Sequence, residues 1–194
     1  MAQKLRTHKL AVTAMLAAVA TVLMFLDFPI PFLIPPFIKL DFSELPALLA
    51  SFALGPVSGV AVCLIKNLIN CLRTTTGGVG ELCNFLLGVC FVVPAGLLYR
   101  RKKCRKNALI GAFTGAVLMA LLSIPVNYFI TYPIYANFMP IDAIVGMYQK
   151  IRPSVNGLLE CLTFFNAPFT LVKGLLDVVL CFLIYKPLSP LLHK

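Results

Sequence analysis

The chain has 194 residues, of which 60% are hydrophobic and only 12% are charged, and its mean hydropathy is +0.93. A soluble domain carries about 25% charged residues, so this composition excludes an ordinary water-soluble fold and indicates a polytopic membrane protein. The formal net charge of +10 comes from clusters beside apolar segments, at 4–9 and in RRKKCRK at 100–106. No basic face with interleaved aromatic residues is present, so we expect no nucleic-acid partner.

Apolar runs and chain breakers predict an all-α protein with six transmembrane helices in a single integral membrane domain over residues 1–194. The predicted helices lie at about 9–27, 43–54, 57–73, 80–99, 108–135 and 167–188. Gly55-Pro56 separates the second helix from the third. The second helix rises only about 18 Å against a membrane core of about 30 Å. We therefore expect it to be tilted, extended at one end, or shielded by protein.

The basic residues predict the orientation in the cell membrane. With the N-terminus inside, six spans place 4–9, 100–106 and the tail with Lys186 and Lys194 in the cytoplasm. The loops 28–42, 74–80 and 136–166 then lie outside. Five spans would leave one basic cluster outside, against the positive-inside rule. Both termini are therefore predicted to be cytoplasmic.

Polar residues gather at the predicted outer ends of four helices. A charge deep in a bilayer costs about 2.5–3.5 kcal/mol, so such residues usually face a cavity or the bundle interior. Together they predict a polar binding cavity near the outer surface. Alternatively, Lys173 and Asp177 could form a self-contained i, i+4 pair, the asparagines could join helices, and Arg73 could extend outward. The polar residues at these predicted outer helix ends are Lys66, Asn67, Asn70, Arg73, Glu81, Asn84, Asn127, Tyr128, Asn166, Thr170, Lys173 and Asp177.

The first loop contains FPIPFLIPPFIKLDF, in which prolines stiffen the chain. Asp41 or Ser43 is predicted to cap the second helix, with Glu44 completing a capping box. Capping does not explain Lys39 or the apolar run, which suit a lid over a flat aromatic ligand. The turn TTTGGVGE at 74–81 lacks the GxxxxGK[ST] pattern of a phosphate-binding loop. Its glycines are expected to let the backbone approach a ligand closely.

No catalytic set is visible, because the sequence has no HExxH, no GxSxG and no acidic magnesium motif. The seven cysteines show no CxxC, so neither a metal site nor a disulfide framework is expected. We expect no enzyme, no cofactor and no nucleotide site, so active transport would need energy from a partner. The alternatives are a stand-alone secondary transporter, which should show an inverted repeat, and a small membrane enzyme.

Small residues mark two helix faces. Ala14 and Ala18 have small-xxx-small spacing on the first helix, where an external protein partner is one option. Gly111 and Gly115 on the fifth helix have the same spacing, and here packing inside the bundle is the preferred interpretation.

Four segments carry a family resemblance: FPIPFLIPPFIKLDFSELPALLASFALGP, TTTGGVGELCNFLLG, NYFITYPIY and PFTLVKG. Through them essentially the whole chain resembles the substrate-binding (S) components of energy-coupling factor (ECF) transporters, in their riboflavin-specific branch. The resemblance implies six helices with cytoplasmic termini and tight binding of riboflavin near the outer surface, under the first loop. It also implies a membrane-embedded coupling subunit (T component) and two cytoplasmic ATPase subunits as partners.

The resemblance also implies residue roles. Asn127, Thr170 and Lys173 would contact the isoalloxazine ring, and Ala14 and Ala18 would meet the coupling subunit. Family members often carry Asn where this chain has Thr170, so the exact flavin (riboflavin, FMN or a relative) stays open, and Asn166 could compensate. The remaining expected ligand-binding residues are Glu81, Asn84, Gly78 and Gly80 for the ribityl chain, Lys39, Asp41 and Phe42 in the closing segment 32–44, and Tyr128.

Overall fold

The structure is a computed structural model that describes residues 2–74 and 76–192. Lys194, predicted to be cytoplasmic, and Thr75 of the glycine-rich turn lie outside these residues. The elements are α1 (Ala2–Phe25), β1 (Phe28–Pro29), β2 (Lys39–Leu40), α2 (Glu44–Leu54), α3 (Pro56–Asn70), a 3-10 turn (Cys71–Arg73), α4 (Val79–Arg101), α5 (Arg105–Val126), a first π segment (Asn127–Thr131), α6 (Tyr132–Tyr135), α7 (Ile141–Gln149), α8 (Leu158–Cys161), a second π segment (Leu162–Asn166) and α9 (Ala167–Leu192).

Within the described residues, five helical stretches are long and apolar enough to cross a membrane. They lie at Arg6–Phe25, Pro56–Arg73, Val79–Arg101, Arg105–Tyr135 and Leu158–Ile184. The sixth predicted span corresponds to α2, which has only 11 residues. Every residue of α2 from Glu44 to Phe52 is buried, so protein shields this short helix from lipid.

Some helix ends differ from the prediction. The first helix begins at Ala2, well before residue 9, because the polar residues ahead of the apolar run continue the same helix. The last long helix begins at Leu158, through α8 and the second π segment. The mixed stretch 136–166 therefore contains the start of that helix, and α7 forms another part of it.

The α2–α3 break occurs at Gly55, whose φ of 102° lies in the left-handed region that favours glycine. Pro56 follows as the first residue of α3, where its missing N–H removes no helical hydrogen bond. Gly55-Pro56 thus ends one helix and starts the next.

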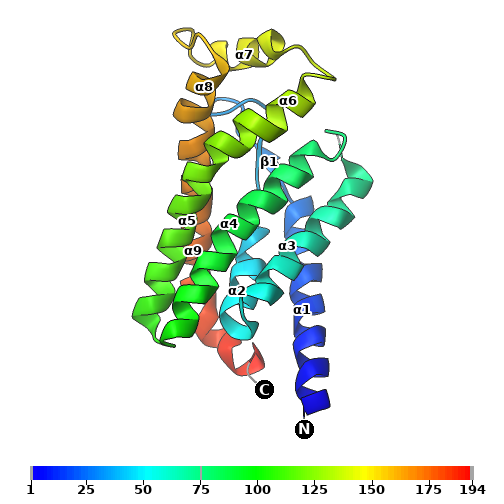
Figure 1. Cartoon of the computed structure of the whole chain (residues 1–194), viewed down its shortest axis with the longest axis vertical. Coiled ribbons are helices and arrows are strands. Elements are labelled where there is room, and N and C mark those ends of the chain that lie inside the picture. Colours follow the sequence, from blue (N-terminus) through cyan, green and yellow to red (C-terminus); the bar gives the residue numbers. More distant parts are fainter. Residues whose placement is uncertain (1, 75, 193–194) are drawn as a thin grey trace.

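The main hydrophobic core surrounds α2. Ala47 and Leu48 of α2, Val62 of α3, and Phe91 and Val92 of α4 are completely buried in it. Helices α4 and α5 run side by side in Figure 1. Close packing is what makes helices associate in lipid, so small residues at such contacts set how near the backbones come.

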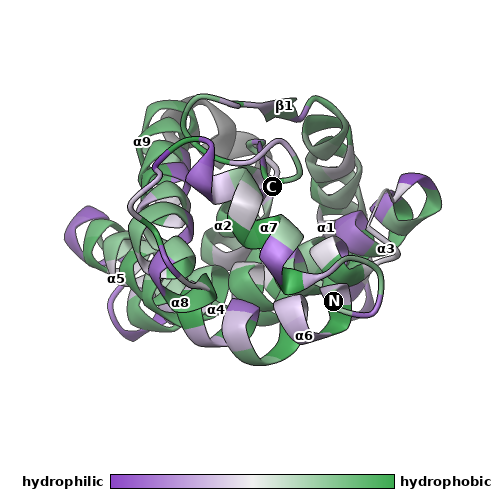
Figure 2. Cartoon of the chain, turned by 90° about the horizontal axis from the view of Figure 1, so that it is seen from above, coloured by the Kyte–Doolittle hydropathy of each residue, from purple (hydrophilic) through white to green (hydrophobic). Residues whose placement is uncertain are grey.

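The start of α1 and the end of α9 lie at the same end of the bundle (Figure 1). The opposite end carries the strands β1 and β2 and the short helices α6, α7 and α8. Viewed from above, most of the helical ribbon is hydrophobic (Figure 2). The strands pair antiparallel, with Phe28 opposite Leu40 and Pro29 opposite Lys39, so the first loop folds back on itself across this end.

Candidate functional site

A cavity of about 230 Å³ lies beneath the first loop, at the end of the bundle away from the chain termini. A single water needs about 10–15 Å³ measured in the same way, so the space suits a small molecule rather than a few waters. Its walls come from the first loop, from the start of α2, and from α1, α3, α4, α5, α6 and α9 with their π segments. Nine residues predicted to bind ligand line it: Lys39, Asp41, Gly80, Glu81, Asn84, Asn127, Asn166, Thr170 and Lys173.

Three residues predicted to bind ligand do not line this cavity. Tyr128 is 40% exposed and its ring packs edge-on against Phe129, because the π segment turns it away from the bundle. Phe42 packs on the small apolar cluster under the loop that includes Phe169. Gly78 precedes α4 with a φ of 86° and serves the turn. These three residues are therefore not part of the described cavity wall.

Lys173 on α9 is paired with Asp41 of the first loop, at 2.8 Å between Nζ and Oδ2. The alternative of a self-contained Lys173–Asp177 pair is therefore wrong. Both carboxylate oxygens of Asp177 are buried without a hydrogen-bond partner in the described part of the chain. Lys173 thus ties the first loop to α9 at the cavity wall.

The Asp41 carboxylate is held in its charged form. Burial opposes ionisation, but the positive charges of Lys173 and Lys66 and the hydrogen bonds from Lys173 and Ser43 outweigh burial and lower the pKa of Asp41 to about 2. Its Oδ1 atom accepts hydrogen bonds from the backbone N–H of Ser43, at 2.8 Å, and from the Ser43 hydroxyl. Asp41 therefore stays an anion that holds Lys173 in place across the neutral pH range.

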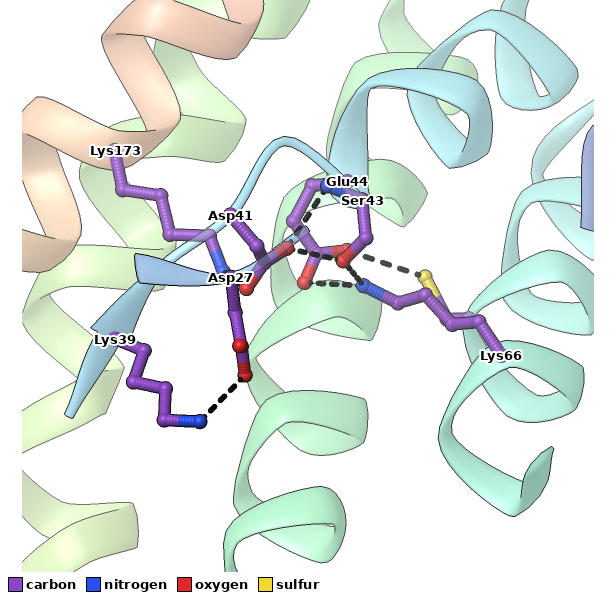
Figure 3. Close-up of polar contacts among 8 residues, drawn as sticks. Asp27, Lys39, Asp41, Ser43, Glu44, Lys66 and Lys173 are labelled. Atoms are coloured by element: carbon purple, nitrogen blue, oxygen red, sulfur yellow. Dashed lines mark hydrogen bonds and ion pairs between the residues drawn. The ribbon is translucent and has the colours of Figure 1, made fainter. Parts of the chain in front are cut away.

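Lys66 of α3 reaches this cluster from the side opposite Lys173 and is completely buried (Figure 3). Its Nζ atom lies 2.8 Å from Oε1 of Glu44 and donates to the Ser43 hydroxyl at 2.5 Å. The capping-box prediction for α2 is therefore wrong, because Ser43 makes no side-chain cap bond and Glu44 is paired with Lys66. The charge on Lys66 favours pairing over capping, since an unpaired buried ammonium is far more costly than an unsatisfied helix N–H.

Glu81 lines the cavity, but its oxygens are already bonded to protein. Asn70 donates to Oε1 at 2.9 Å, and the Thr74 and Thr76 hydroxyls donate to Oε2 at 2.9 and 3.2 Å. Thr76 also accepts from the backbone N–H of Gly80 at 3.2 Å. Glu81 therefore joins the end of α3 to the start of α4 and fixes the glycine-rich turn that forms one cavity wall.

The predicted asparagines Asn127 and Asn166 reach the cavity from two π segments. We did not predict these π segments from the sequence. In each, an amide bonds the carbonyl five residues earlier, Tyr132 to Asn127 and Ala167 to Leu162. Each segment ends two residues before a proline, in NYFITYP and LTFFNAP. A proline lacks the N–H that an α-helix needs for the carbonyl four residues earlier, so the helix widens there. That recurring spacing is the signal that sequence reasoning missed.

Lys39 lies at the cavity rim. It pairs with Asp27 at 3.0 Å, with 36% and 21% of the two side chains exposed. Arg73 also lines the cavity, and its guanidinium stands 4.6 Å from the Phe25 ring centre. Phe37 contributes an apolar wall. The site therefore combines a charged rim, fixed amides and aromatic walls, which suits a partly aromatic, partly polar small molecule.

Similarity to known proteins identifies the family. Residues 8–185 match the family model described as ECF transporter, substrate-specific component. The chain belongs to the substrate-specific (S) components of ECF transporters. It is 36% identical to the riboflavin transporter RibU of Staphylococcus aureus, over 97% of this chain and 94% of that protein. It is 32% identical to the riboflavin transporter FmnP of Bacillus subtilis, over 98% and 96%.

A solved structure of the S component of a bacterial ECF transporter is also similar, with a TM-score of 0.76 and 34% sequence identity. The match covers 97% of this chain and 99% of that one. This S component is therefore a multi-pass protein of the cell membrane, in a family of transport proteins rather than enzymes.

The small residues of this S component fall into two groups. Ala14 and Ala18 are exposed on α1, so the structure leaves that face uncovered. A Cβ added to Gly111 would lie 2.8 Å from the Ala95 carbonyl oxygen, and one added to Gly115 would lie 2.3 Å from that of Phe91. The prediction that these two glycines serve packing inside the bundle is confirmed.

Proposed function

We propose that this S component binds riboflavin with high affinity on the outer side of the cell membrane and delivers it inward. Transport is driven by ATP hydrolysis in partner subunits: a membrane-embedded T component and two cytoplasmic ATPases. The named relatives are riboflavin transporters over nearly their whole length, which supports the ligand. Membership of the ECF family supports the partners.

The observation that best supports this ligand is that Asn127, Thr170 and Lys173 line one cavity beneath the first loop. An isoalloxazine ring needs flat apolar walls and a few fixed polar groups at its edge, and a ribityl chain needs further polar contacts. The cavity has both apolar walls and polar groups. In this arrangement Lys173 donates to the ring edge from a position held by Asp41, and the loop closes over the ring.

The proposed topology has six crossings, with α2 as the short one and both termini in the cytoplasm, in a single membrane domain. The common position of the start of α1 and the end of α9 supports an even number of crossings. The basic run 100–106 connects α4 and α5 near that end, which supports a cytoplasmic location for it.

The visible spectrum of the protein tests the ligand. Protein purified in detergent from cells grown with riboflavin should carry the absorption bands of oxidised isoalloxazine in stoichiometric amount. Ligand-free protein should quench riboflavin fluorescence on titration, and FMN added as a competitor measures whether the phosphate is accepted. A folded, colourless protein that does not quench riboflavin would overturn the proposal for this ligand.

A further inference from the structure

Three buried side chains from three elements form a closed ring of hydrogen bonds: Tyr132 of α6, Tyr148 of α7 and Asn166 of the second π segment. The two hydroxyl oxygens are 2.7 Å apart, and Tyr148 donates to Oδ1 of Asn166 at 2.7 Å. Nδ2 of Asn166 donates to the Tyr132 hydroxyl at 3.4 Å. Exposure is 5% or less for all three. Two members of this ring, Tyr132 and Asn166, line the cavity.

With Oδ1 of Asn166 facing Tyr148 and Nδ2 facing Tyr132, the hydrogen bonds of this ring run in one direction. Each phenol carries one proton, and Tyr148 gives its proton to Asn166. The bond between the two hydroxyls must therefore be donated by Tyr132, whose oxygen accepts from the Asn166 amide. Burial, followed by the neighbouring Tyr132, raises the pKa of Tyr148 well above its ordinary value. The Tyr148 hydroxyl thus stays a donor at any physiological pH.

In this order both ends of the Asn166 amide are engaged by the ring. Its oxygen is committed to Tyr148, and one N–H of its NH₂ group points at Tyr132, which leaves the second N–H. Asn166 and Tyr132 line the cavity, whereas Tyr148 does not. A side chain outside the cavity therefore sets the hydrogen-bonding character of one inside it.

Tyr148 also meets the first loop. The ring of Phe37, which lines the cavity, packs edge-on against Tyr148 with 6.2 Å between centroids and an interplanar angle of 83°. Helix α7 is therefore anchored at one residue both to the amide in the second π segment and to the loop over the site.

We infer that Tyr148 is a positioning residue, which orients Asn166 so that it presents an N–H donor to the cavity and selects an acceptor atom on the ligand. The chemistry recognised is a carbonyl oxygen or an unprotonated ring nitrogen of a heteroaromatic system. The inference rests on the proposed function for its ligand, since the isoalloxazine ring of riboflavin carries both kinds of acceptor. It gives Asn166 a defined role at a site where Thr170 offers only a hydroxyl.

A double-mutant cycle on riboflavin binding tests this inference. Fluorescence quenching is measured for the wild type, Tyr148→Phe, Asn166→Ala and the double variant, with Tyr128→Phe as an exposed control. We expect Tyr148→Phe to weaken binding about fivefold, as the loss of one hydrogen bond implies, and to have no further effect when Asn166 is already Ala. Equal losses in both backgrounds, or wild-type binding by Tyr148→Phe, would overturn the inference.

A second variant separates positioning from support of the fold. Asn166→Asp keeps the oxygen that accepts from Tyr148 and removes both N–H donors. The affinity for riboflavin should therefore fall about tenfold or more. The melting temperature of the variant identifies any general loss of fold. Wild-type affinity in Asn166→Asp would mean that an oxygen faces the ligand, and the inference would fail. If the wild type itself binds no riboflavin, the proposed function fails and this inference fails with it. If the wild type binds riboflavin but the Tyr148 and Asn166 substitutions act independently, only this inference fails.

Discussion

The Nζ atom of Lys66 lies 2.8 Å from Oε1 of Glu44, and the two side chains are 0% and 1% exposed. The pair joins α3 to the first residue of α2, beside the pair formed by Lys173 and Asp41. The two ion pairs thus connect three helices and the first loop at one cavity. Removing one member of such a network is strongly destabilising, because its partner is left as an unpaired charge in the protein interior.

Replacing Lys66 by Met should destabilise the protein strongly. Glu44 would be left as a buried carboxylate without its partner, at a cost of about 3–5 kcal/mol. Lys39→Met is the matched control, since its partly exposed pair with Asp27 is worth about 0–1 kcal/mol. Unfolding in detergent, followed by melting temperature, measures both. Equal shifts for the two variants would contradict the assigned burial, and adding Glu44→Gln to Lys66→Met should recover part of the loss.

Lys173→Ala should weaken riboflavin binding about tenfold or more, because a charge-assisted hydrogen bond to the ligand is lost. Lys150→Ala, at the exposed end of α7, serves as a control for removing a lysine. Fluorescence titration gives the affinities, and melting temperatures identify any general loss of fold. Wild-type affinity in Lys173→Ala would remove this residue from the site.

Acid should destabilise the protein through Asp41. Its pKa is lowered from 3.8 to about 2 in the fold, so the unfolded chain takes up this proton more readily. The stabilisation, about 2 kcal/mol, is fully present above the unfolded pKa and is lost as the pH falls through about 2. Melting temperatures between neutral pH and pH 2 measure it. Asp41→Asn should flatten this part of the profile, and an unchanged profile would exclude Asp41 as its origin.

Ala14→Trp should leave riboflavin binding intact and block uptake, because a bulky ring on this exposed face prevents close helix contact with the proposed T component. Leu109→Trp, on a 52% exposed position of α5, controls for a tryptophan at the protein surface. Uptake of labelled riboflavin by cells that contain the partner subunits is compared with binding by the purified protein. Loss of binding with normal uptake would reverse the assignment.

Gly115→Ala should destabilise the α4–α5 contact by about 1–3 kcal/mol through overpacking, since the new Cβ would lie 2.3 Å from the Phe91 carbonyl oxygen. At Gly146 in α7, an added Cβ meets no atom of the described residues within 4 Å. Gly146→Ala should therefore be neutral or stabilising by about 0.5–1 kcal/mol. Melting temperatures that move together in the two variants would contradict this difference in packing.

Much of the fold and part of the site follow from short-range patterns in the sequence. Apolar runs predict the long helices, and polar residues at i and i+3, Thr170 and Lys173, mark the face of α9 that lines the cavity. Glycine and proline at 55–56 predict the break before α3. These features depend on neighbours within a turn or two of helix, which a single sequence displays.

The pairing of charges did not follow from the sequence. Lys173 has Asp177 one turn away, yet it bonds Asp41, 132 residues distant in the chain. Glu44 has the spacing of a capping residue, yet it pairs with Lys66. In a buried cluster each charge takes the partner that desolvation and packing bring nearest, and that choice depends on how the loop and three helices meet. Tyr128 was misplaced for a related reason, because the π segment rotates the helix face by an amount that α-helical periodicity does not include.

The shielding of α2 also bears on how the protein responds to membranes of different thickness. Its 11 residues rise about 16 Å, roughly half the bilayer core, and protein surrounds it from Glu44 to Phe52. The long helices adjust to a thinner or thicker bilayer by tilting, but α2 has little lipid contact through which mismatch could act. The depth of Glu44, and of the charge network to which it belongs, is therefore set by neighbouring helices, so membranes of different lipid composition should leave this part of the cavity wall unchanged.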